Sequence, residues 1–384
     1  MTVVTSSIRP ARAVPSLVTL QLFSVAGGCC QFRGCGKYLL EHAVTKRAGN
    51  FAEKAHIFAF SVSGPRGKSP GRPKDVHTLE NLMLLCAHCH KQVDDDPDAF
   101  PAELLRVFKH EHEERFRRAA KLSPECEAVV LIVTAPIAGT APVVPRGDVI
   151  AALSPLYPAE SQFAHIDLSD LKGEREGEAF NALACRKIDR EIARLFADGS
   201  ALSRTPRIAL FAIAPIHILA HLGSRLENKI PLHLFQRHRD TQNWTWKEPT
   251  TGIRYRARVL QQRPRGAPVA LVLSLSGTIG LSDLPQPTRD DAAIYEITLD
   301  GVVPTPTFLN SAEDLAAFAP VLHEAWALIA AEHGFVDSVD VFPAVPAPIA
   351  VLLGRERLMK RHPALRLHDA DKVNGGFVFQ IEVK

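Results

Sequence analysis

Two closely spaced cysteine pairs are the residues of this chain whose types and spacing point most directly to chemistry. Cys30 and Cys35 are separated by four residues, and Cys86 and Cys89 are separated by two. Thiolates at these spacings suit a tetrahedral structural Zn²⁺ site. Cys29 adjoins Cys30 and competes with it as a ligand, but we favour Cys30 because its spacing to Cys35 is the more usual one. The alternative is two pairs of buried free cysteines.

Three further polar residues stand in a fixed order around the cysteine pairs: His56 in AHIF, Asn81 in ENLMLLC, and His90 directly after the last cysteine. Together these segments resemble the HNH endonucleases of the ββα-metal fold with a four-cysteine zinc site, over roughly residues 28–94. The resemblance implies that His56 takes a proton from water, as a neutral imidazole does near pH 7. It implies that Asn81 orients the loop of His56 and that His90 binds a catalytic Mg²⁺, which stabilises charge at the scissile phosphate.

One position departs from the pattern of the HNH endonucleases. Many HNH enzymes carry a second metal ligand just before the base, where this chain has Ala55. The metal shell is then completed by Glu53, by water or another residue, or by oxygen atoms of the DNA.

Basic residues predict sequence-independent binding of double-stranded DNA through its phosphates, although each one alone also fits a solvated surface. They are Arg33, Lys37, Lys46, Arg47, Arg66, Lys68, Arg72 and Lys74.

Charge and composition divide the chain into two parts. Its 384 residues are 46% hydrophobic and 23% charged, which is typical of folded proteins and excludes a disordered chain. The net charge of +3 is uneven: residues 1–125 hold 18 Lys+Arg and 13 Asp+Glu, and the remainder holds 27 and 29. We therefore predict a basic HNH domain over residues 1–122 and a nearly neutral domain over residues 125–384, which is long enough for its own core.

The second part alternates apolar runs with helical patterns. Runs rich in Val and Ile begin at positions 128, 207, 268, 293 and 338, and helical patterns occupy 179–196 and 311–333. Such alternation predicts parallel sheets covered on both faces, here two Rossmann-like halves. Similar segments at 134–140, 274–279 and 341–353 hint at an internal duplication. The sequence contains no GxGxxG fingerprint and no P-loop, so it does not support NAD or ATP binding.

Four segments in this part resemble the SAVED domain, a fusion of two CARF-like units that senses cyclic oligonucleotides. They are RIALFAIAPIHILAHLG, LHLFQRHRDTQNWTW, LVLSLSGTI and VFPAVPAPIAVLLGR, within residues 129–384. The predicted fold is therefore mixed α+β and α/β, with a ββα-metal HNH domain containing structural zinc and a SAVED domain of two fused Rossmann-like (CARF-like) units. This combination resembles CBASS anti-phage effectors, in which a cyclic dinucleotide such as cGAMP binds SAVED, drives homo-oligomerisation and activates DNA degradation.

The loops after the strands supply the expected ligand site, because Rossmann-like sheets bind ligands beyond the carboxyl ends of their strands. Indoles can stack on bases, while a guanidinium, hydroxyls and a helix N-terminus can hold phosphates. The two tryptophans equally fit packing on one face of a strand. The six residues expected to bind the ligand are Arg237, Trp244, Trp246, Ser274, Ser276 and Pro346.

We expect a cytoplasmic protein without a membrane partner. The first 16 residues have no apolar core of signal-peptide length, and the apolar stretch 208–222 is shorter than the ~20 residues that span a bilayer.

Two alternative functions stay open. One is a non-catalytic zinc module that binds DNA and is coupled to a nucleotide sensor. The other is a modification-dependent restriction endonuclease, against which the near-neutral second part argues because DNA readers need a basic face.

Overall fold

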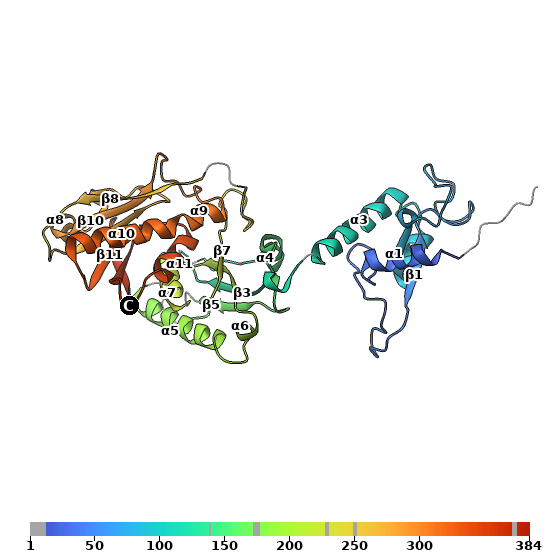
Figure 1. Ribbon diagram of the computed structural model, residues 1–384, viewed down its shortest axis with the longest axis horizontal. Helices are drawn as coiled ribbons and strands as arrows, with labels where there is room; N and C mark the ends of the chain where they lie inside the picture. The colour runs from blue at the N-terminus through green and yellow to red at the C-terminus, as the bar shows by residue number, and fades with distance from the viewer. Residues whose placement is uncertain are drawn as a thin grey trace, which may run out of the picture. The chain divides into compact units, whose positions relative to one another are not determined.

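A computed structural model describes residues 13–120, 122–137, 140–171, 177–226, 230–248, 252–370 and 375–384. Residues 1–12, which include most of the segment in which we expect no export signal, lie outside the described residues. The chain divides into two compact units, Met1–Leu122 and Ser123–Lys384 (Figure 1).

The first unit is built around a small antiparallel sheet and the helix that follows it. Strand β1 (Ala52–His56) pairs with β2 (Leu82–Cys86), and the 3₁₀-helix η1 (Leu79–Asn81) leads into β2. Every residue of β2 is buried, as its sequence LMLLC requires. Helix α2 (Ala87–Asp95) begins directly after β2, which completes the predicted ββα arrangement. Helices α1 (Ser16–Ala26) and α3 (Ala102–Ala119) pack together, and both contribute to the core of this unit.

The second unit contains a five-stranded sheet whose paired strands all run parallel, as predicted. Four of its strands lie in the order β4-β3-β6-β7, and β5 also pairs with β3. The strands are β3 (Glu127–Thr134), β4 (Tyr157–Pro158), β5 (Ala164–Asp167), β6 (Ile208–Ile213) and β7 (Leu232–Phe235). The helices in this half are η2 (Pro124–Cys126), α4 (Arg146–Leu153), α5 (Glu178–Leu195), α6 (Ala201–Arg204) and α7 (Ile216–Arg225).

A six-stranded sheet follows in the order β13-β12-β11-β9-β10-β8. Its four inner strands are parallel, whereas the edge strands β8 and β13 are antiparallel, which the sequence patterns did not predict. The strands are β8 (Tyr255–Gln261), β9 (Val269–Ser274), β10 (Ala293–Leu299), β11 (Ser338–Ala344), β12 (Ala364–Ala370) and β13 (Phe377–Val383). The helices are η3 (Leu281–Asp283), α8 (Gln286–Asp291), α9 (Ala312–Ala316), α10 (Phe318–His333) and α11 (Ala347–Arg355).

One hydrophobic core joins the two sheets of the second unit. Helices α5, α7, α10 and α11 pack there against one face of each sheet, and Figure 1 shows α10 lying along the second sheet. The stretch Ala312–His333 is long and apolar enough to cross a membrane, with a mean hydropathy of 1.3. In this fold, however, it places Phe318, Leu322 and Trp326 in the core, as a helix inside a globular domain does.

The two sheets repeat one arrangement of elements. In each, a strand, a helix and a next parallel strand follow in order: β6, α7 and β7 in the first, and β11, α11 and β12 in the second. The segments 134–140 and 274–279 follow equivalent strands, β3 and β9, as the duplication hint suggests. Residues 341–353, by contrast, cover the end of β11 and most of α11, whose counterparts in the first half are the end of β6 and α7. Helices α7 and α11 pack directly on each other, with Gly223 of one and Gly354 of the other at the contact.

Candidate functional site

Four cysteines of the first unit converge on one point. The Sγ atoms of Cys30, Cys35, Cys86 and Cys89 all lie within 4.8 Å of one another. A Zn–S bond of about 2.3 Å places the sulfur atoms of a tetrahedral site about 3.8 Å apart, so the cluster fits a Zn²⁺ ion. Backbone N–H groups already point at two of the sulfurs, from Cys86 to Cys30 at 3.3 Å and from Cys89 to Cys86 at 3.5 Å.

The chemistry of the cluster also suits a metal. Burial raises the pKa of the Cys30 thiol to about 12, and burial together with the hydrogen bond to Cys86 raises the pKa of Cys89. Such thiols become good ligands only when a cation replaces their protons. Cys29 lies outside the cluster, and its thiol donates to the carbonyl of Gly27. The structure therefore places Cys30, and not its neighbour, among the four converging sulfurs.

His56 and Asn81 are brought together by the end of β1 and the start of β2. Asn81 is buried, accepts a hydrogen bond from the backbone N–H of Phe58 at 2.9 Å, and donates to the carbonyls of Phe58 and Val76. It therefore holds the turn that follows His56. The Nε2 atom of His56 lies 3.3 Å from Nδ1 of His77.

The environment of His56 favours its neutral form. Burial is the main cause that lowers its pKa, and the charges of His77 and His90 lower it further. A neutral imidazole is the form that accepts a proton from water. His90, one residue after Cys89 on α2, behaves in the opposite way, because its hydrogen bond with Asp94 raises its pKa.

Two residues that the sequence did not single out as partners support His90. Asp94 lies four residues further along α2, and its Oδ2 is 3.3 Å from Nε2 of His90. The Arg66 guanidinium contacts Oδ1 of Asp94 at 3.0 Å. The spacing of His90 and Asp94 on one helix face was the sequence signal for this pair. Arg66 lies in a Gly- and Pro-rich loop, and no local pattern marked it.

The predicted basic surface needs a correction. Arg66 is only 7% exposed and donates to the carbonyls of Ile57 and Val93, so it does not face DNA. Arg72 donates to the carbonyls of Ala59 and Phe60. Arg72 therefore serves its own loop and Arg66 joins that loop to α2, because a guanidinium has five donors that need partners.

The second unit contains a cavity of about 450 Å³ at the carboxyl ends of strands from both sheets. Residues after β6, β7, β9 and β11 line it, together with the first residues of α7 and α11. It is therefore located where parallel α/β sheets bind ligands. Both helices begin next to it, after Pro215 and Pro346, and a helix N-terminus favours an anion.

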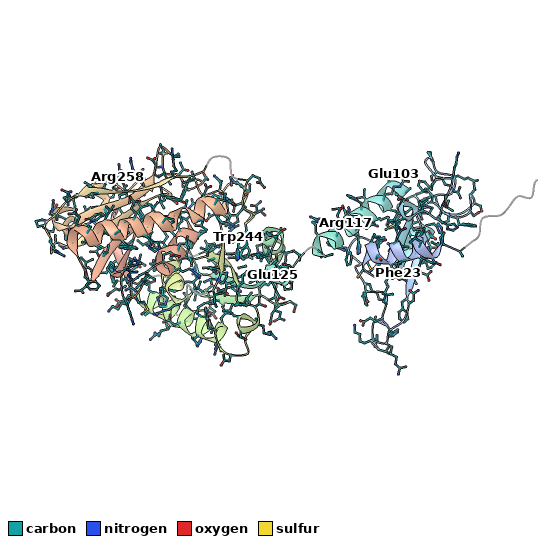
Figure 2. The ribbon with its side chains drawn as sticks, viewed as in Figure 1. Phe23, Glu103, Arg117, Glu125, Trp244 and Arg258 are labelled. Carbon is teal, nitrogen blue, oxygen red and sulfur yellow. The ribbon has the colours of Figure 1, made fainter. Side chains whose placement is uncertain are left out.

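Three of the six residues predicted to bind the ligand line this cavity, namely Arg237, Ser276 and Pro346. Trp244 does not. Its side chain is 1% exposed and packs edge-on against Phe211 within the second unit (Figure 2). The expectation that Trp244 stacks on a base is therefore wrong, because its indole belongs to the core.

Ser274 and Trp246 also differ from the expectation, since neither lines the cavity. Ser274 is fully buried, and its hydroxyl accepts a hydrogen bond from the backbone N–H of Ile279 at 3.2 Å. It therefore shapes the loop that contains Ser276. Trp246 donates to the carbonyl of Leu234 and packs edge-on against His238, which does line the cavity. Trp246 therefore supports His238 and does not itself face the cavity.

Polar atoms at the cavity wall lack partners within the part of the chain that the structure describes. They are Oε1 of Gln236, Nε of Arg237 and Nε2 of His238, and all three are buried. Burial and the charge of Lys247 lower the pKa of His238, so its ring is neutral near pH 7. Buried polar atoms without partners are costly, so this wall is suited to a ligand that supplies hydrogen bonds. Gln236, which adjoins Arg237, was not among the residues predicted to bind the ligand.

Two family models match the chain. Residues 188–383 match SAVED, the SMODS-associated and fused to various effectors sensor domain, and residues 30–96 match an HNH endonuclease. No curated protein matches the sequence.

Distant solved structures resemble the chain. One is a Cap4 SAVED/CARF-domain containing receptor of Acinetobacter baumannii with the cyclic trinucleotide 2'3'3'-cAAA, at 13% identity and a TM-score of 0.45, covering 77% of this chain and 61% of that one. The Moraxella osloensis Cap4 receptor matches at 14% identity and a TM-score of 0.40, covering 77% of this chain and 60% of that one. The chain therefore spans less than two thirds of either receptor.

Proposed function

Because the chain belongs to the SAVED family of sensor domains fused to effectors, we propose that it is an endonuclease switched on by a cyclic oligonucleotide. An HNH endonuclease domain joined to a SAVED sensor domain is the combination found in CBASS effectors. The finer proposals concern the ligand, the substrate, the metal and the way in which the two domains act together.

The ligand that we propose is a cyclic dinucleotide of the cGAMP type. The observation that supports it is the cavity with three buried polar atoms without partners among the described residues. Two helix N-termini adjoin the same cavity, and a cyclic dinucleotide offers two phosphates and two bases with hydrogen-bonding edges. Arg237 and Ser276 are the proposed phosphate contacts, and His238 and Gln236 the proposed contacts to base edges.

The reaction that we propose is hydrolysis of double-stranded DNA with little sequence preference. His56 takes a proton from the attacking water, and its lowered pKa keeps it neutral for that role. Asn81 keeps the turn after His56 in place through its three hydrogen bonds. A divalent cation such as Mg²⁺, held by His90, would neutralise charge at the phosphate and the leaving oxygen. Structural Zn²⁺ on the four cysteines maintains the turn from β2 to α2, where His90 lies.

Activation is proposed to occur by homo-oligomerisation of the chain when the messenger binds. A nonspecific nuclease that is always active would damage the DNA of its own cell, and control by a messenger would prevent that damage. We place the protein in the cytoplasm, where DNA and messenger are accessible and where its seven cysteines, none of which forms a disulfide, would remain reduced.

A plasmid cleavage assay tests the whole proposal. Purified protein is incubated with plasmid and Mg²⁺, with and without a panel of cyclic dinucleotides and trinucleotides, and its oligomeric state is measured by light scattering. We expect degradation and a larger assembly with a cyclic dinucleotide only. Cleavage that needs no nucleotide would contradict the proposed gating, and cleavage that follows a cyclic trinucleotide alone would contradict the proposed cyclic dinucleotide ligand.

The variant His56→Ala separates an enzyme from the alternative of a non-catalytic DNA-binding module. We expect this variant to bind the messenger and to oligomerise as the parent does, without cutting DNA. If it degrades DNA at the parental rate, His56 is not the base. If neither protein ever cuts, the non-catalytic reading replaces ours.

A further inference from the structure

The cation beside His90 lacks an obvious second protein ligand. Ala55 stands directly before His56, and its methyl group cannot bind a metal. Glu53 precedes it by two residues on β1, so both side chains leave the strand on the same face. In the register of the sheet Glu53 lies opposite Leu85, one residue before the strand end from which α2 begins. Glu53 and His90 are thus neighbours across the ββα unit.

The two nitrogens of His90 have different surroundings. Nε2 lies 3.3 Å from Oδ2 of Asp94, and Nδ1 lies 4.0 Å from Oε2 of Glu53. A ring N–H that donates to a carboxylate leaves a lone pair on the other nitrogen, which is the arrangement of metal-binding histidines. The Asp94 carboxylate therefore directs the free electron pair of His90 toward Glu53.

The Asp94 side chain is 38% exposed, but neighbouring side chains engage both of its carboxylate oxygens. Its Oδ1 accepts from the Arg66 guanidinium at 3.0 Å. The Arg66 side chain is only 3% exposed and donates to the carbonyls of Ile57 and Val93 at 2.6 Å each. Arg66 thereby ties the turn after His56 to α2. Both Asp94 oxygens have protein partners, whereas Glu53 is 53% exposed and open to an ion and to a phosphate.

We propose that Glu53 is the second protein ligand of the catalytic cation, beside Nδ1 of His90, and that Asp94 positions His90 for it. Metal–ligand bonds of about 2.0–2.2 Å allow two ligand atoms of one ion to be up to about 4.2 Å apart. The observed 4.0 Å between Nδ1 and Oε2 is close to that limit, which applies to ligands on opposite sides of the ion, and the exposed Glu53 side chain can move closer to take a neighbouring position. Carboxylate oxygen with one imidazole nitrogen is a donor set that Mg²⁺ and Mn²⁺ accept. The inference rests on the proposed nuclease function.

Cation binding can be measured without catalysis. The full chain carrying His56→Ala is titrated with Mn²⁺ in the presence of a short DNA duplex, and free Mn²⁺ is followed by electron paramagnetic resonance. Adding Glu53→Gln should weaken Mn²⁺ binding at least tenfold. Adding Asp94→Asn should weaken it by 10- to 100-fold, as loss of a supporting carboxylate does. The control Glu103→Gln changes an exposed glutamate on α3 and should leave binding unchanged (Figure 2).

The possible results are distinguishable. Zinc content and the thermal unfolding temperature of each variant show whether the first unit remains folded. Parental Mn²⁺ affinity in the Glu53→Gln protein would overturn the inference and leave the nuclease proposal standing. Unchanged binding with Glu53→Gln but complete loss with Asp94→Asn would make Asp94 the ligand, which also overturns it. If the His56→Ala parent binds no Mn²⁺ with DNA present, the metal-dependent nuclease proposal fails as well.

Discussion

The contact between α7 and α11 supports a quantitative prediction about a single methyl group. A Cβ atom added at Gly354 would lie 1.8 Å from the carbonyl oxygen of Ala220, and one added at Gly223 would lie 1.9 Å from the oxygen of Val351. Both obstacles are backbone atoms within helices, so no side-chain rotation relieves them. We predict that Gly354→Ala destabilises the second unit.

The magnitude follows from two opposing effects. Carbon–oxygen contacts of this kind are normally about 3.3 Å or longer, so the helices must separate by about 1.5 Å locally. Overpacking of a core costs about 1–3 kcal/mol and occasionally more. Alanine stabilises a helix interior by up to about 1 kcal/mol relative to glycine. A clash with rigid backbone belongs at the upper end of the ~1–3 kcal/mol cost of overpacking. After the helix gain of alanine is subtracted, we expect the free energy of unfolding to fall by about 2 kcal/mol.

Urea unfolding followed by tryptophan fluorescence measures this change. The chain has three tryptophans, Trp244, Trp246 and Trp326, and all lie in the second unit, so the signal reports that unit alone. Gly147→Ala is the control, since Gly147 is helical and a Cβ there meets nothing among the described residues within 4 Å. We expect it to be neutral or slightly stabilising. A Gly354→Ala midpoint equal to that of the control would refute the reasoning.

Three further predictions concern the sites. At saturating Mg²⁺, which keeps His90 deprotonated, the lowered pKa of His56 should put the midpoint of the acid limb of the pH–rate profile below the ordinary ~6.5 of histidine, and a midpoint above 6.5 would contradict this. Cys30→Ser should lose the zinc found by mass spectrometry and unfold the first unit, whereas Cys29→Ser should keep both zinc and fold. Arg237→Ala should weaken cyclic dinucleotide binding at least tenfold in calorimetry, and Arg263→Ala, which changes a half-buried arginine that does not line the cavity, should not. Equal affinities would remove Arg237 from the ligand site.

Features set by local sequence were predictable. The apolar runs became β3, β6, β9, β10 and β11 because a strand buried on both faces needs apolar residues at consecutive positions. The two cysteine pairs converged because each spacing turns two thiols to the same side. Asn81 and His90 lie beside His56 because β1 and β2 are antiparallel and α2 follows at once. The resemblance, rather than the spacing, suggested their roles.

Features set by long-range contacts were not predictable. Arg66 looked like a phosphate contact in a basic loop, but carbonyls of residues distant in the sequence bury its guanidinium. Trp244 and Trp246 are two positions apart, which suggested one strand face, yet neither lies in a strand. One fills the core and the other supports His238. Only the three-dimensional packing decides between such outcomes, because the same residue types fit both.

The crossing of α7 and α11 has a consequence for recognition. The same spacing separates Pro215 from Pro346 and Gly223 from Gly354, so related segments face each other across the cavity as in a symmetric dimer. Fusion into one chain frees each copy to diverge: Ile216 on one wall of the cavity corresponds to Ala347 on the other. Identical subunits would present the same wall twice. If the proposed cyclic dinucleotide binds between them, two unlike walls would favour one orientation of a ring with two different linkages and would so tell linkage isomers apart.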